Sequence, residues 1–168
     1  MKIKITLAIA ATAALMSGAA IAEEKVDGKA LAKALPSASV TLEQGLKASE
    51  AKGKPISAKY EVEDGALQLS VYTSSGNQFF EVVVDNKTGK ISKTEEIKDG
   101  DDLKEAKEQT AAMSKATTSL EKAATDAEKA NAGYRAVSVE AETKGGHPVA
   151  EIVLLKGTAT KKIDQKLD

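Results

Sequence analysis

The chain has 168 residues and a formal net charge of −1, from 24 basic and 25 acidic side chains. This balance excludes the basic surface of a nucleic-acid-binding protein and gives no attraction to an anionic membrane. The chain has no cysteine and a single histidine, so neither disulfides nor a zinc or copper centre are expected. Aromatic residues are only 3% of the chain, and the core must therefore be built from Ala, Val, Leu and Ile.

The N-terminus has the pattern of a secretory signal peptide. Lys2 and Lys4 form a short basic start. The uncharged run 5–16 follows, and Ala20 and Ala22 fit the small-residue cleavage pattern. The apolar run is shorter than the roughly 20 residues that a membrane span requires. We therefore predict cleavage after Ala22 and a mature protein that is periplasmic or secreted.

Two short helices are predicted next. Asp27 is placed to cap the first helix, which Pro36 ends. Thr41 is placed to cap the second, and Gln44 stands at the spacing of a reciprocal capping box. Gly53 follows the second helix and ends it.

Alternating polar and apolar residues then predict a group of strands at 56–63, 66–73, 78–85 and 91–97. Asp64 and Gly65 are typical of a two-residue hairpin turn, in which both positions need positive φ. Gly89 is predicted to adopt the left-handed conformation in a second tight turn. Adjacent hairpins predict an antiparallel sheet with a helix covering one face.

The segment 99–131 is predicted to be helical, because its apolar residues recur at spacings of three and four. The pattern fits one long helix or two helices equally well. A break at 117–119 would give the second helix a capping box from Thr118 and Glu121. Few of the apolar residues are Leu or Ile, which favours helices lying on a sheet over a coiled coil.

Three more strands are predicted at 134–143, 148–155 and 158–167. The last strand has only Ile163 and Leu167 as apolar anchors. With so few anchors, this strand could pair with another chain.

Two stretches of the chain share one layout of a helix followed by strands, which suggests an internal repeat. The predicted fold class is α+β, with two tandem modules that each pack a helix on a small antiparallel β-sheet. The expected division is a signal peptide (1–22), an N-terminal helix and linker (23–40), a first module (41–97), a connecting helix (98–117) and a second module (118–168).

The strongest motif is the run Glu-Val-Val-Val-Asp-Asn-Lys-Thr-Gly-Lys-Ile at 81–91. This run resembles the E-V-x-V-D-x-x-T-G-K-[VI] segment of the PepSY domain family. In the second stretch, 145–154 is similar to the family's G-x-P-V-x-E-[VI] segment. Residues 162–167 depart from the family because they lack the Thr-Gly turn, so the second copy is degenerate.

The PepSY resemblance implies a non-catalytic module. Such domains occur in propeptides of secreted zinc peptidases and in exported proteins, where they are proposed to restrain peptidases or regulate envelope proteins. The resemblance therefore implies a protein partner, with a peptidase as one candidate. The alternative is a periplasmic protein that binds a small ligand or a cation.

No residue pattern predicts catalysis, a cofactor or a metal. His147 lies in a predicted turn, and no nucleophile or carboxylate is marked as its partner. The acidic run 99–102 lacks the spacing of a calcium loop, and a helix N-cap at Asp99 or Asp101 explains it better. Asp85 begins a turn between two strands, which favours a hairpin there. We therefore expect no enzyme.

The aromatic residues are the candidate partner-binding residues. Strand parity places Phe80 on the core side, so Phe79 is expected on the opposite side together with Tyr72. Tyr134 is likewise expected opposite the apolar side of its strand. We predict that Tyr72 and Phe79 form a cross-strand pair that contacts a protein partner, unless a helix covers them.

Overall fold

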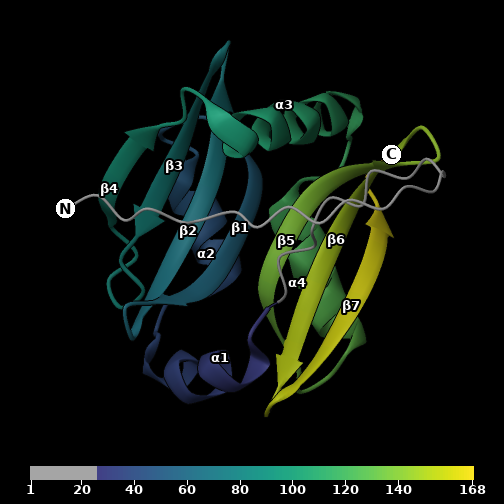
Figure 1. Cartoon of the computed structure of the whole chain (residues 1–168). Coiled ribbons are helices and arrows are strands. Elements are labelled where there is room, and N and C mark those ends of the chain that lie inside the picture. The colour runs from purple at the N-terminus through teal and green to yellow at the C-terminus, as the bar shows by residue number, and fades with distance from the viewer. Residues whose placement is uncertain (1–25) are drawn as a thin grey trace, which may run out of the picture.

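The structure is a computed structural model that describes residues 26–168, and the predicted signal peptide with its cleavage site lies outside the described residues. Within residues 26–168 the chain is α+β, and its strands form one antiparallel sheet (Figure 1). The helices are α1 (Gly28–Ala34), η1 (Leu35–Ser37), α2 (Leu42–Ser49), α3 (Gly100–Lys115) and α4 (Leu120–Ala130). The strands are β1 (Lys54–Glu63), β2 (Ala66–Ser75), β3 (Gln78–Val84), β4 (Ile91–Glu96), β5 (Arg135–Lys144), β6 (His147–Lys156) and β7 (Ala159–Lys166).

Local sequence signals are confirmed at the hairpins and helix starts. Asp64 and Gly65 have φ of 49° and 79° in the turn between β1 and β2, and Gly89 has φ of 73°. The side chains of Thr41 and Gln44 form the predicted capping box at the start of α2. These elements begin and end where turn and capping chemistry places them.

The expectation of two separate small sheets is wrong, because one sheet runs through the whole described chain in the order β4-β3-β2-β1-β5-β6-β7. β1 to β4 form one half of the sheet and β5 to β7 form the other. β1 and β5, the first strand of each half, pair at the centre, and we call this pairing the seam. This seam is short, because β1 and β5 pair only through Ser57 with Glu140, Ala58 with Val139, and Lys59 with Ser138. The chain therefore builds the sheet outward from the seam in both directions.

The helices lie on both sides of the sheet. Figure 1 shows α3 in front of the strands, and α2 and α4 behind them. We call the α3 side the front face and the α2–α4 side the back face. The Lys54 ammonium at the start of β1 donates a hydrogen bond of 2.7 Å to the Met113 carbonyl oxygen, which ties α3 to the front.

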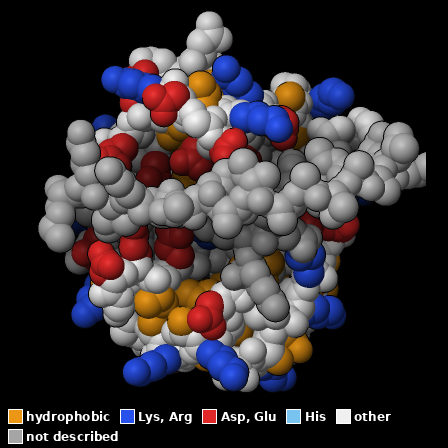
Figure 2. Space-filling model, viewed as in Figure 1, with side chains coloured by type: hydrophobic (Ala, Val, Ile, Leu, Met, Phe, Trp, Pro, Cys, Tyr) orange, Lys and Arg blue, Asp and Glu red, His pale blue; other side chains and the backbone are white. Residues whose placement is uncertain are grey.

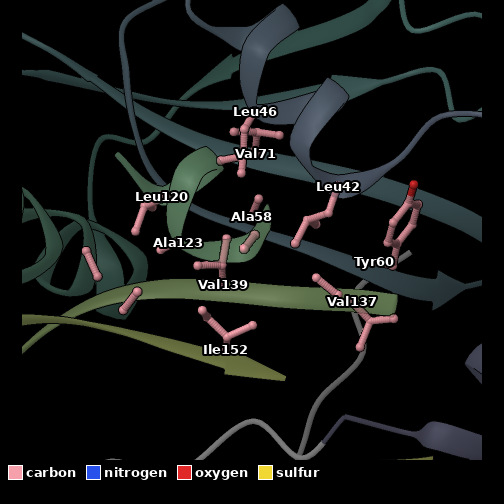
Figure 3. Close-up of a cluster of buried hydrophobic side chains, with 14 of the residues drawn as sticks. Leu42, Leu46, Ala58, Tyr60, Val71, Leu120, Ala123, Val137, Val139 and Ile152 are labelled. Carbon is pink, nitrogen blue, oxygen red and sulfur yellow. The ribbon is translucent and has the colours of Figure 1, made fainter. Parts of the chain in front are cut away.

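The main core lies on the back face, where α2 and α4 pack on each other above the seam. Figure 3 shows side chains of α2, α4, β1 and β5 meeting in one cluster, which includes Leu42, Leu46, Ala58, Leu120, Ala123 and Val139. All six are at most 2% exposed. The two halves therefore share one hydrophobic core.

The long helical segment is two helices. α3 ends at Lys115 and α4 begins at Leu120. The cap of α4 is Ser119, whose hydroxyl accepts a hydrogen bond from the Lys122 amide, and the prediction of Thr118 as the cap is wrong. The Thr118 amide instead donates to the Leu167 carbonyl oxygen at 2.9 Å.

Leu167 anchors the last strand. Its side chain is fully buried, and its carbonyl oxygen also accepts a hydrogen bond from the Thr117 amide at 2.7 Å. β7 pairs with β6 along its whole length. The weakly apolar final strand is therefore part of this chain's own sheet.

Candidate functional site: the front face of the sheet

A row of mostly acidic residues crosses the front face. The strand register aligns one residue from every strand, and five of the seven carry a carboxylate. From edge to edge, this acidic row is Glu95, Glu81, Tyr72, Ser57, Glu140, Glu151 and Asp164. Figure 2 shows Asp and Glu side chains gathered across the middle of this face.

The neighbouring row on the same face carries the basic residues. In register with one another, its members are Lys93, Val83, Ser70, Lys59, Ser138, Val153 and Lys162. The two rows carry most of the polar residues of the front face, whereas the back face is apolar. This division follows from period-2 alternation along each strand.

Lysines pair with the acidic row towards the β7 edge. Lys144 lies 3.0 Å from Glu151 and 2.8 Å from Asp164. Lys162 lies 2.8 Å from Glu151. Burial raises the pKa of Glu151, but the contacts with Lys162 and Lys144 outweigh burial, so the pKa of Glu151 is lowered overall. The charges on this side of the face are therefore compensated.

At the centre of the first half, two carboxylates converge on one buried hydroxyl. The Ser70 hydroxyl lies 2.8 Å from a Glu81 oxygen and 3.2 Å from a Glu61 oxygen. A serine hydroxyl has one hydrogen, so it donates to one of these carboxylates at a time. The Lys59 ammonium lies 3.2 Å from Glu61. We define the acidic centre as Glu61 and Glu81 of this half together with Glu140, which lies across the seam on β5.

Glu140 sits beside the seam and has a strongly perturbed pKa. Burial is the main cause that raises this pKa, and the nearby carboxylates of Glu105, Glu151 and Glu142 raise it further. Lys59 acts in the opposite direction, and the resulting pKa is about 7. A carboxyl with this pKa changes charge near neutral pH, so the charge of the front face depends on pH in that range.

The predicted aromatic pair does not form an open surface. Phe79 is on the front side, as strand parity predicts, but it is only 6% exposed. The Ile97 amide donates to the Phe79 carbonyl oxygen at 2.8 Å, so the segment leading into α3 lies beside this residue. Phe79 stands opposite Ser74 in the register, and Tyr72 stands opposite Glu81. The expectation that Phe79 is accessible is therefore wrong.

Tyr72 lies within the acidic row and is half-buried. The Lys59 ammonium is 5.9 Å from the centre of the Tyr72 ring, within the range of a cation–π contact. Burial raises the pKa of the Tyr72 hydroxyl. Tyr72 is therefore the only predicted aromatic residue that the structure places in the acidic row.

Tyr134 lies elsewhere. It immediately precedes β5, and the Lys156 ammonium lies 5.6 Å from its ring centre. Glu140 is six positions further along the chain, which corresponds to roughly 20 Å at about 3.3 Å per residue. Contact of Tyr134 with a partner stays a prediction that is separate from the acidic row.

The remaining candidate residues have structural roles. His147 is exposed and pairs with Asp168. The Asp85 carboxylate accepts hydrogen bonds from the amides of Lys87 and Thr88 and from the Thr88 hydroxyl, which lower its pKa. Asp99 occupies the N-cap position of α3 without a side-chain hydrogen bond to the helix.

Within the part of the chain that the structure describes, no group of three or more His, Cys, Asp or Glu side chains is arranged to hold a metal ion. None of the helices between residues 26 and 168 is long and apolar enough to cross a membrane. No protein-family model, curated protein or solved structure matches this chain.

Sequence reasoning missed the acidic centre. Glu61, Glu81 and Glu140 each stand on the polar side of an alternating strand, which was visible in the sequence. The β1–β2 and β2–β3 hairpins bring Glu61 and Glu81 together, but the position of Glu140 beside them depends on how β1 pairs with β5. These two strands are about 80 residues apart, with no local signal for their pairing. The missing information was the register of the seam.

Proposed function

We propose that this chain is a non-catalytic protein-binding module that acts outside the cytoplasm and recognises its partner through the front face. The observation that carries this proposal is the acidic row across all seven strands. Adjacent strands are about 4.8 Å apart, so the row is roughly 29 Å long. α3 packs on β1, β2, β5 and β6, and Ser57 in the middle of the row is buried, so a partner would contact the row on the two sides of this helix. A surface of this length suits a segment of another protein better than a small molecule.

Charge complementarity indicates what the partner presents. Glu61, Glu81 and Glu140 gather three carboxylates on the two sides of the seam, where Lys59 contacts Glu61, whereas Lys144 and Lys162 pair with the carboxylates near β7. A partner with Lys or Arg side chains would therefore be favoured at the acidic centre. The half-buried Tyr72 ring adds an apolar contact for the stem of such a side chain.

We also propose that the two halves are tandem PepSY-like modules fused into one sheet. The order of the strands supports this, because each half contributes its first strand to the seam and its later strands to an edge. The PepSY resemblance then suggests that the partner is a peptidase or another envelope protein that this chain restrains or regulates.

The test is affinity capture with the tagged chain 23–168 from an envelope extract of its own organism, read by mass spectrometry. The wild type is compared with the double variant Glu61→Gln and Glu81→Gln, which removes two charges and keeps the side-chain shapes. The matched control carries Glu50→Gln and Glu108→Gln, because both residues are exposed and lie outside the acidic row. Circular dichroism verifies that all variants are folded.

Support requires one protein that the wild type and the control enrich and the Glu61/Glu81 variant does not. Equal capture by all three would place binding away from the acidic centre, and no specific capture would contradict the proposal. Capture that requires added calcium would favour the cation-binding alternative. With the purified partner, affinity should fall as salt concentration rises, because exposed charges are screened.

A further inference from the structure

The outer backbone edge of β7 is a second surface, and the proposed function uses only the Asp164 side chain of this strand. β7 is eight residues long and pairs with β6 in one regular register from Lys156 with Ala159 to Val149 with Lys166. Among residues 26–168, no strand pairs with its other side, which forms one edge of the sheet in Figure 1. The strand contains neither proline nor glycine. Within the described part of the chain, its outer backbone groups are therefore left to accept another strand.

The opposite edge of the sheet differs. β4 has six residues, and its pairing with β3 shifts register between Val83 and Val84. A bulge of this kind bends an edge strand and discourages pairing with another chain. β7 shows no such shift. Of the two edges, β7 is the one suited to strand addition.

The hydrogen bonds show which residues of β7 face outward. The Leu167 amide donates to the Pro148 carbonyl oxygen at 3.0 Å. Leu167 and Pro148 are therefore a hydrogen-bonded pair, and the backbone groups of Leu167 point towards β6. Bonded and non-bonded pairs alternate along an antiparallel ladder. The backbone groups of Lys162 and Asp164 therefore point away from β6, as do those of Thr160 and Lys166.

We propose that two copies of this chain associate by antiparallel pairing of β7 with β7 about a twofold axis at Ile163. In this register Lys162 of each copy faces Asp164 of the other, and both residues have outward backbone groups. Thr160 faces Lys166, and Lys161 faces Gln165. No residue faces a residue of like charge. The result is one continuous sheet with twice the seven strands of one copy.

Other registers fit less well. Pairing centred on Lys162 or on Asp164 brings two identical charges face to face, which is unfavourable. Pairing centred on Gln165 needs the backbone beyond Lys166. There the Leu167 carbonyl oxygen is already bonded to the amides of Thr117 and Thr118.

Contacts within each copy support the Ile163 register. Asp164 lies 2.8 Å from Lys144, and Lys162 lies 2.8 Å from Glu151. Pairing of Lys162 with Asp164 of the second copy therefore joins two ion pairs into a row of alternating charge. Ile163 stands opposite the fully buried Ile152 and packs at the edge of the core. Contact between the two Ile163 side chains extends this core across the axis.

Single cysteines test the register directly, because the chain has no cysteine of its own. In the proposed dimer the two copies of residue 163 form a non-hydrogen-bonded pair with Cα atoms about 4.5 Å apart, which permits a disulfide. Ile163→Cys should therefore give a disulfide-linked dimer under mild oxidation. The matched control is Lys161→Cys on the same side of the same strand, because the two copies of residue 161 lie four residues apart in this register.

Charge reversal and mixing provide a second test, read by sedimentation velocity over a wide concentration range. Lys162→Asp and Asp164→Lys each place like charges opposite one another, so each variant alone should be monomeric. An equimolar mixture restores both ion pairs and should dimerise. A wild type that stays monomeric at all concentrations, or equal cross-linking of the two cysteine variants, would overturn the proposal. Neither result bears on the acidic row, so the two proposals fail separately.

Discussion

The guanidinium of Arg135 donates a hydrogen bond of 2.8 Å to the Val40 carbonyl oxygen, although the two residues are 95 positions apart. The same guanidinium lies 3.2 Å from the Tyr60 hydroxyl and 5.4 Å from the ring. Tyr60 itself donates to the Val40 carbonyl oxygen. The Val40 carbonyl oxygen therefore accepts hydrogen bonds from Tyr60 of β1 and from Arg135 of β5. These bonds join the two halves of the sheet beyond the point where β1 and β5 stop pairing.

Replacing Arg135 should weaken the whole fold. Arg135→Ala removes a charged donor from a partly buried site, and we expect the free energy of unfolding to fall by about 2 kcal/mol. Urea denaturation measures this change. The control is Lys104→Ala, an exposed residue of α3 whose replacement should have little effect. A loss no larger than that of the control would show that the contact with Val40 does not stabilise the seam.

Glu140 should make stability depend on pH near neutrality. The unfolded chain loses this proton near its ordinary pKa of 4.5, whereas the folded chain keeps it until about pH 7. Between these values the folded state binds more protons, so its stability falls as pH rises, and the penalty is complete above pH 7.

Glu140→Gln removes this penalty and keeps the side-chain shape. We expect the variant to be more stable than the wild type by about 1–2 kcal/mol at about pH 8 and nearly equal to it at about pH 4. Urea denaturation at both pH values measures the difference. A constant difference between the two pH values would exclude titration of Glu140 as the cause.

Gly45 allows α2 to pack closely on the sheet. A Cβ atom at this position would lie 2.6 Å from a methyl carbon of Leu69, which is fully buried. Gly45→Ala should therefore destabilise the protein by about 1–3 kcal/mol, although alanine is the better helix former. Thermal unfolding measures this loss. In the double variant with Leu69→Val the clash is relieved, so the two changes should cost less together than their sum.

Leu167 should matter more than its place next to the C-terminus suggests. Its side chain is fully buried, and we expect Leu167→Ala to cost about 2–4 kcal/mol, measured by urea denaturation. Asp168→Ala is the control, because Asp168 is exposed and its side chain pairs with the exposed His147. If both variants lost a similar free energy of unfolding, the loss would come from disturbance of the whole C-terminus and not from the buried Leu167 side chain.

The sequence predicts the local parts of this fold well. The turns at Asp64–Gly65 and Gly89 depend on backbone conformations that few residues adopt, so short motifs identify them. The capping box at Thr41 and Gln44 is similarly local. Strand alternation also placed Phe79 and Phe80 on opposite sides. Each of these features is decided within a few residues.

The arrangement of these parts could not be predicted in the same way. Whether Phe79 is exposed depends on tertiary packing, and its side chain is only 6% exposed once the chain has folded. The acidic centre depends on the seam, which aligns Glu140 with residues of the first half. Such pairings arise from tertiary packing, and no nearby residue signals them.

The seam also has a consequence for the rate of folding. Every other strand pair joins neighbours along the chain, through loops or hairpins that close quickly. Pairing of β1 with β5 must close a loop of about 80 residues and is rewarded by only three residue pairs. The two halves therefore reach native-like hairpins before they meet, and the encounter of Ser57, Ala58 and Lys59 with β5 is the step that we expect to limit folding.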